Sequence, residues 1–320
     1  MTECEALLAK WITPITESQP TGRNLREDGS PLAPYHQLRD ARALARNAER
    51  AALAEGEVVY FALETWQTVY DLCAELLEQQ SKDMEVVAWL IESLIRLRGF
   101  QGFAVGFSTA TALINRYGVA LHPQPDEEGL MTQLGPLLGL CGFGSDGPLV
   151  SPLKSLPLTE VVDTGALATW QCEQIFEVDR MSDSKKKAAR LAQGVATREV
   201  LDKTVAASSD AFLLARETEL IAAIDAFDQF QSVVAHYADA DTQPTRKLAE
   251  CLDACRQMLT YIAGERLVKF KSDAPNQCET ESNHCAHTDG SESDTTHELM
   301  EIKSVKQLVI RDRQMALSLL

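Results

Sequence analysis

The sequence predicts an all-α protein, an antiparallel helical bundle or array that ends in a flexible linker and a terminal helix. Apolar residues recur at every third or fourth position over most of the chain, which places them along one face of a helix. No alternating run of β-branched residues is long enough to indicate a sheet. Apolar residues make up 45% of the 320 residues, which is ample for one large domain or two smaller ones.

The first two helices are expected at residues 2–12 and 35–55. Thr2 and Glu5 have the spacing of a capping box, so they indicate the start of a helix and not a signal peptide. The second helix is rich in alanine and arginine, and its small inward side chains permit close helix contact. Residues 13–34 lie between the two helices, and their Pro and Gly content predicts an ordered loop at most.

Three further helices are predicted between Glu64 and Tyr117, with the second of them in the middle of the domain. Ser81 is expected to cap this second helix, and Asp83 lies where the positive end of its dipole favours an anion. Gly99 is expected just after the end of the helix, because glycine adopts a left-handed turn at little cost. Short turns make the three helices antiparallel neighbours.

The second half of the chain predicts a less regular connector, then more helices, then a change of character. The connector covers 118–158, and helices follow over 164–270, one of them capped by Ser209 and the last one at 248–270. Residues 272–298 hold seven acidic residues and neither Lys nor Arg. Such a segment cannot bury enough apolar surface to offset the entropy that it would lose on folding. The expected domains are 1–160 (an N-terminal helical domain), 161–271 (its continuation, a second helical subdomain), 272–298 (an acidic disordered linker) and 299–320 (the start of a C-terminal helical domain).

Composition limits the classes of partner. The net charge of −17 opposes nucleic-acid binding, which requires clustered Lys and Arg. An acidic surface suits a protein partner with basic patches, or it serves solubility alone. No apolar run approaches the length that spans a bilayer. We therefore expect a cytoplasmic protein without membrane insertion.

The cysteines and histidines predict neither a disulfide framework nor a cofactor. Most cysteines lie among apolar or helical neighbours, and the cytosol would keep them reduced. Cys251 and Cys255 share a helix face, but no His stands beside them at zinc-ligand spacing. One local cluster has the residue types of a metal site, although a biased linker explains it better. Its members are Cys278, His284, Cys285 and His287.

No catalytic residue is predicted. A glycine-rich stretch, Gly139, Gly142, Gly144 and Gly147, precedes Pro148 where a phosphate-binding loop needs a helix N-terminus. The adjacent carboxylates Asp126, Glu127 and Glu128 fit a solvated turn better than a catalytic pair. The basic run Lys185, Lys186 and Lys187 is short and fits a helix start or a solvated face.

One stretch of the chain resembles a known family. It includes Ser81-Lys82-Asp83 and Trp89-Leu90, and its spacing over about fifty residues resembles the ImpA-type N-terminal domain of TssA proteins of the bacterial type VI secretion system. The residues that carry the resemblance are Trp66, Ser81, Lys82, Asp83, Trp89, Gly99, Phe100, Gly102 and Phe103. The segments with Pro20, Gly22, Leu25 and Arg26, and with His122-Pro123, resemble further parts of that domain. Gly118 departs from the family, which commonly has an aromatic residue there, and the basic residue expected near Gln133 is absent.

The resemblance implies a structural assembly protein without enzymatic activity. Its implied partners are the type VI baseplate, tube and sheath proteins, with self-association mainly through a C-terminal ring domain of which only the start is expected here. Alternatives are an accessory protein at the sheath end, an inactive copy with the same N-terminal domain, or an enzyme on a helical scaffold. The run Ser81–Asp83 is expected as a helix cap and turn, with partner docking as the functional alternative. Trp66 and Trp89 are expected in the core, with an interface as the alternative, because exposed aromatic residues can be binding hot spots. All nine residues that carry the resemblance are candidates for partner docking.

Overall fold

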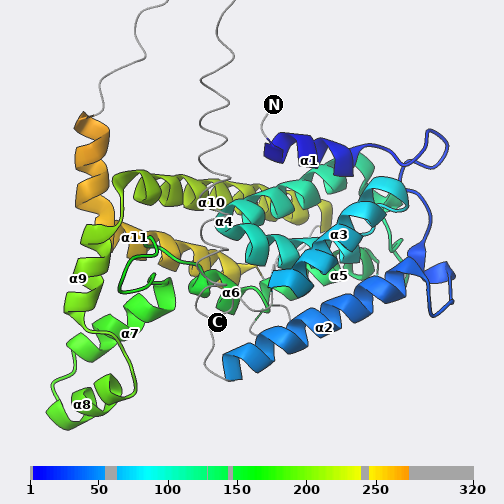
Figure 1. Ribbon diagram of the computed structural model, residues 1–320. Helices are drawn as coiled ribbons and strands as arrows, with labels where there is room; N and C mark the ends of the chain where they lie inside the picture. The colour runs from blue at the N-terminus through cyan, green and yellow to red at the C-terminus, as the bar shows by residue number, and fades with distance from the viewer. Residues whose placement is uncertain (1–2, 55–62, 128, 143–146, 239–244, 274–320) are drawn as a thin grey trace, which may run out of the picture. The chain divides into compact units, whose positions relative to one another are not determined.

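The structure is a computed structural model that describes residues 3–54, 63–127, 129–142, 147–238 and 245–273 (Figure 1). Within these residues the chain forms helices joined by loops with isolated β-bridges and no strand, which confirms the all-α prediction. The α-helices are α1 (Glu3–Ile12), α2 (Pro34–Ala54), α3 (Leu63–Gln79), α4 (Met84–Tyr117), α5 (Leu130–Cys141), α6 (Val150–Ser155), α7 (Thr169–Asp179), α8 (Ser184–Ala192), α9 (Arg198–Ala207), α10 (Asp210–Ala238) and α11 (Arg246–Asp273). Two short 3-10 helices are η1 (Leu25–Glu27) and η3 (Gly118–Ala120).

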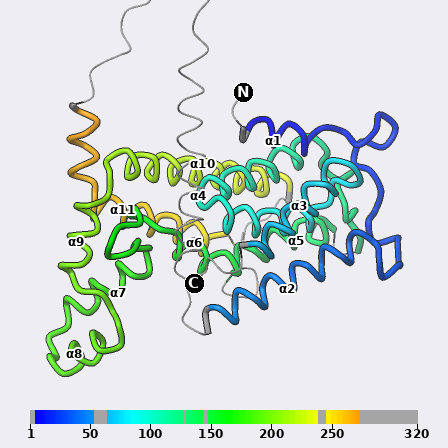
Figure 2. The backbone as a smooth tube through the Cα atoms, viewed as in Figure 1, coloured from blue at the N-terminus to red at the C-terminus, as the bar shows by residue number. Residues whose placement is uncertain are grey.

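Helix α4 lies at the centre, between α3 and α10 (Figure 1 and Figure 2). Its helical stretch is broken at Gly99, whose φ of 58° is a conformation that favours glycine. The two halves of α4 fold back on each other there. A Cβ on Gly102 would lie 2.1 Å from the carbonyl oxygen of Leu94, so only glycine permits this approach. The second and third central helices of the sequence prediction are therefore two halves of a helical hairpin that turns at Gly99.

The hydrophobic core runs through α4 from both sides. Phe103 and Phe107 project from the second half of α4 against α10, and the ring of Phe107 lies 5.0 Å from those of both Phe227 and Phe230. All four rings are buried. On the opposite side, Leu38 and other small or apolar residues of α2 are buried, as the alanine-rich pattern predicted.

The connector predicted for residues 118–158 is more helical than expected, because it contains α5 and α6. Helix α5 includes Pro136 and two glycines, which normally end helices. Leu134 and Leu137 on the same helix are completely buried. The free energy gained by burying this apolar face exceeds the cost of the backbone hydrogen bond that is missing at Pro136. Tertiary packing therefore overrides the low helix propensity of these residues.

The C-terminal helices follow the sequence prediction more closely. Ser209 caps α10, since its Oγ accepts a hydrogen bond of 3.2 Å from the amide of Phe212. Helices α7 and α9 share a small hydrophobic cluster of their own around Ile175 and Leu201. The main core runs from Trp11 in α1 to α11, and the boundary at residue 160 stays a prediction. The linker at 274–298, the helix at 299–320 and the cluster Cys278, His284, Cys285 and His287 lie outside the described residues.

Candidate functional site

Three separate parts of the chain meet at the start of α4. They are residues 20–26 before α2, residues 80–85 between α3 and α4, and residues 121–123 after η3, and we call this region the corner. Backbone hydrogen bonds join them, since the amide of Lys82 donates to the carbonyl of Thr21 at 2.8 Å and the amide of His122 donates to the carbonyl of Lys82 at 3.0 Å. The corner is therefore a small three-segment pairing within an all-helical protein.

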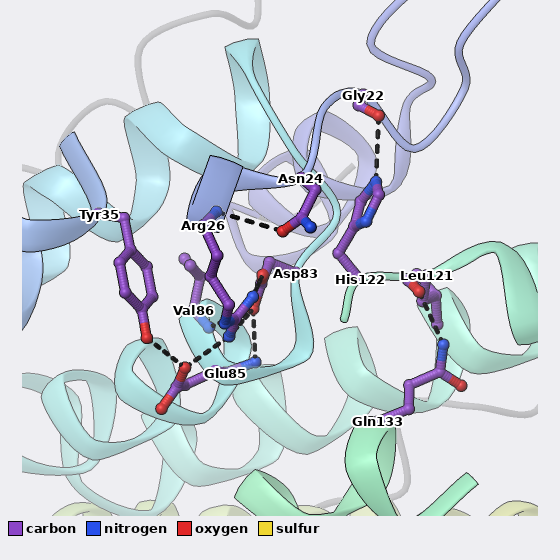
Figure 3. A network of polar contacts seen from close by, with 10 residues as sticks. All are labelled: Gly22, Asn24, Arg26, Tyr35, Asp83, Glu85, Val86, Leu121, His122 and Gln133. Carbon is purple, nitrogen blue, oxygen red and sulfur yellow. Dashed lines mark hydrogen bonds and ion pairs between the residues drawn. The ribbon is translucent and has the colours of Figure 1, made fainter. Parts of the chain in front are cut away.

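Gly22 permits the close approach of the first two segments. Its φ is +71°, and a Cβ at this position would lie 2.1 Å from the carbonyl oxygen of Gln80. The carbonyl oxygen of Gly22 also lies 3.1 Å from Nε2 of His122 (Figure 3). A carbonyl can only accept, so Nε2 must be the donor and carry a proton. In the neutral ring Nδ1 is then an acceptor, and it is buried without a hydrogen-bond partner among the described residues.

Arg26 links the loop to the first turn of α4. Its guanidinium donates to Oδ2 of Asp83 at 2.5 Å and to Oε2 of Glu85 at 2.5 Å, and the hydroxyl of Tyr35 donates to the same Glu85 oxygen at 2.7 Å (Figure 3). Burial lowers the pKa of Arg26, but its bonds to both carboxylates outweigh this and raise the pKa. Burial and the bond to Glu85 raise the pKa of Tyr35 to about 12. At neutral pH Arg26 is therefore a cation and Tyr35 a neutral donor.

The cap of α4 differs from the sequence prediction. Asp83 is the N-cap, because its carboxylate accepts from the amides of Glu85 (2.9 Å) and Val86 (3.3 Å). Ser81 was predicted as the cap, and this is wrong. It lies too far before the first turn, and its hydroxyl is buried without a hydrogen-bond partner among the residues that the structure covers. The carboxylate of Asp83 thus serves both the helix end and Arg26.

Lys82 points inward from the same run. Its side chain is completely buried, and Nζ donates to the carbonyl of Leu77 in the last turn of α3 at 2.5 Å. Burial lowers the pKa of Lys82 from 10.5 to about 8, partly opposed by Glu78. The ammonium is still mostly protonated at neutral pH and lies at the negative end of the α3 dipole.

A hollow of about 750 Å³ lies against the corner. Its charged lining residues are Arg23, Arg26, Glu27, Glu85 and Asp126. The remaining lining residues are polar or small, apart from two prolines. The size lies within the usual range for ligand pockets, but the lining is far more polar than that of a small-molecule site.

The predicted tryptophans lie in the core, as expected. Trp66 is completely buried and its indole donates to Glu49 at 3.2 Å, with the guanidinium of Arg96 4.2 Å above the ring. Trp89 is 4% exposed and stacks on Tyr35 at 5.7 Å between ring centroids. Trp89 therefore packs against Tyr35, which in turn donates a hydrogen bond to Glu85 in the corner.

The last part of the motif lies away from the corner, at the opposite end of the first half of α4. Gly99 forms the turn of the hairpin, and Gly102 allows its halves to touch. Phe100 and Phe103 are completely buried. The structure thus brings Ser81, Lys82 and Asp83 together with Gly22, Arg26 and His122. It places the tryptophans and phenylalanines of the motif in the core, and the two glycines at the hairpin. Partner docking through the motif residues stays a prediction.

Three residues of the network were not singled out by the sequence as contributors. Tyr35 and Glu85 complete the Arg26 network, and Gln133 donates to the carbonyl of Leu121 at 2.8 Å while it accepts from Tyr237 at 2.9 Å. Opposite charges at Arg26 and Glu85 are visible in the sequence, but 59 positions separate them and nothing local pairs them.

The glycine-rich stretch, the adjacent carboxylates and the lysine run have structural roles wherever their residues are described. Gly142 ends α5 with a left-handed φ of 109°, and Asp126 accepts a hydrogen bond from Thr132 in an exposed turn. Lys185, Lys186 and Lys187 lie in the first turn of α8, in agreement with a helix start. Gly144 and Glu128 fall outside the described residues. In the described part of the chain, no three His, Cys, Asp or Glu residues gather as metal ligands, and no helix is long and apolar enough to cross a bilayer.

A known protein family matches the part of the chain that contains the corner network. Residues 12–142 match the family described as ImpA, N-terminal, type VI secretion system. Every residue drawn in Figure 3 lies within that range. Residues 12–142 are therefore similar to the ImpA N-terminal domain. This confirms the resemblance that the motif residues indicated.

A solved structure extends the comparison beyond the ImpA N-terminal domain. It is the N-terminal domain, including the conserved ImpA_N region, of the TssA component of the type VI secretion system from Burkholderia cenocepacia. The two chains are 24% identical, with a TM-score of 0.67, and the match covers 81% of this chain and 94% of that one. At this identity the likeness shows a shared fold. The comparison with curated proteins finds no match.

Proposed function

We propose that this chain is a TssA-like structural component of the type VI secretion system. In this role it contacts the baseplate and coordinates polymerisation of the tube and sheath from the cytoplasm, without catalysing a reaction. The observation that carries the proposal is the match of residues 12–142 to the ImpA N-terminal domain of that system, because this range contains the whole corner. The fold shared with a TssA N-terminal domain supports it.

The corner suits a structural role. Its charged groups are held by one another, as Arg26 binds both Asp83 and Glu85, and Asp83 is completely buried. Buried ion pairs add little net stability compared with apolar packing, but they fix one arrangement of the segments that they join. Such a network is a rigid support for a binding surface.

The experiment that tests the proposal is release of the tube protein into the medium. Cells that lack the gene are compared with the same cells carrying a copy that encodes these 320 residues. We expect deletion to abolish release and the copy to restore it. An equal amount of tube protein inside the cells, measured by immunoblot, is the control for expression. Unchanged release after deletion would contradict the assembly role.

A further inference from the structure

We propose that the hollow at the corner receives a Lys or Arg side chain of a partner protein. This inference rests on the proposed function, since it identifies the chemistry by which the corner would bind a type VI protein. The occupant is a positively charged side chain on the surface of that partner. Two features of the hollow favour such an occupant: the buried nitrogen of His122 that is unpaired among the described residues, and the surplus of carboxylates.

The buried group left unpaired at the hollow is an acceptor. His122 lines the hollow and is only 6% exposed. The carbonyl of Gly22 accepts a hydrogen bond from Nε2–H, so in the neutral ring Nδ1 carries a lone pair that meets no donor among the described residues. A buried unsatisfied acceptor is costly, and a donor from a partner would remove that cost.

The carboxylates of the lining add further acceptors. Both hydrogen bonds of Glu85 described above use Oε2, so Oε1 takes part in neither. Glu27 and Asp126 are exposed at the rim of the same hollow. These groups together accept hydrogen bonds and attract a cation.

The charge around the hollow also favours a cation. Three carboxylates and two guanidinium groups line the hollow, and the buried carboxylate of Asp83 lies behind Arg26. Arg26 is already engaged by two of those carboxylates, and Arg23 donates to the side-chain oxygen of Gln80 at 2.6 Å. The surplus is negative, in a chain with a net charge of −17. Complementary charge guides encounter and fixes the register of a complex.

The test measures binding of the full chain to purified type VI tube, sheath and baseplate proteins by biolayer interferometry. The double variant Glu27→Lys/Asp126→Lys reverses two exposed carboxylates of the hollow. Asp225→Lys/Glu265→Lys is the matched control, because it makes the same charge change at exposed positions on α10 and α11. We expect the hollow variant to raise the Kd at least tenfold and the control to leave it within twofold. Gln124→Lys, which adds a positive charge at the rim, should weaken binding in the same direction.

The outcomes separate this inference from the proposed function. If a type VI protein binds the wild type and the hollow variant equally well, the inference is overturned and the assembly role stands. If none of these proteins binds the wild-type chain, the proposed function is overturned together with the inference. Weaker binding by the hollow variant and the control variant alike would indicate general charge attraction and would also overturn the inference.

Discussion

Replacement of Lys82 by methionine should change how the stability of the protein depends on pH. Lys82 is completely buried, and burial lowers its pKa from 10.5 to about 8. Between these two values the unfolded chain binds the proton more tightly than the folded chain does. The free energy of unfolding therefore rises with pH in this window, and below about pH 8 the cost of burying the ammonium is present in full.

The size of the effect follows from the two pKa values. Each pKa unit corresponds to about 1.4 kcal/mol, so the full contribution is about 3 kcal/mol. Between pH 7 and pH 9.5, Lys82 should contribute a rise of about 2 kcal/mol. Methionine has a similar length and no charge, so the variant lacks this rise. It also loses the bond to the carbonyl of Leu77, which costs about 1 kcal/mol at every pH.

Urea unfolding at several values between pH 7 and pH 9.5, followed by tryptophan fluorescence, measures the difference. Other groups that titrate in this range, such as the buried cysteines, are common to both proteins and cancel in the comparison. Lys10→Met removes an exposed lysine of α1 and should follow the wild type at every pH. Parallel curves for the wild type and Lys82→Met would refute the reasoning, because they would mean that Lys82 titrates at the same pH in the folded and unfolded chains.

Three other substitutions, two of them paired with a control variant, test the fold by urea unfolding. Gly102→Ala should destabilise by at least about 3 kcal/mol, because its Cβ would meet a backbone oxygen at 2.1 Å, whereas Gly139→Ala in α5, with open space around the Cβ, should stabilise by about 0.5 to 1 kcal/mol. Equal effects would contradict the hairpin. Ser209→Ala should cost about 1 kcal/mol through loss of the α10 cap, and Ser232→Ala, inside α10, should be near neutral. Asp83→Ala should cost about 3 to 5 kcal/mol, because it removes both the cap of α4 and a buried partner of an ion pair, and a cost below 1 kcal/mol would count against the corner network.

Periodic apolar spacing was sufficient to predict the helices and much of the core. Residues such as Trp66 and Leu38 lie inside, where their spacing placed them. The exceptions are α5 and α6, and in α5 Pro136 and the neighbouring glycines were more prominent than the leucines between them. Whether a helix tolerates such residues depends on what its apolar face packs against, and this is a property of the whole fold.

The corner was only partly predictable. The motif identified Lys82 and Asp83, but the choice of Asp83 over Ser81 as the cap depends on where α4 begins, and this is uncertain from sequence by a few residues. The pairing of Arg26 with Asp83, and of His122 with Gly22, depends on how loops return across the domain. No local pattern encodes such distant contacts, so they required the structure.

The contacts of the corner also constrain when this region can form in a newly made chain. Its contacts join residues far apart in the sequence, with 57 positions between Arg26 and Asp83 and 100 between Gly22 and His122. Contacts of this kind close long loops and form slowly in comparison with helical turns. A ribosome must therefore release residues beyond His122 before the hollow can take shape. An unfinished chain therefore lacks the hollow, and the partner binding that we propose for it requires a completely synthesised and folded domain.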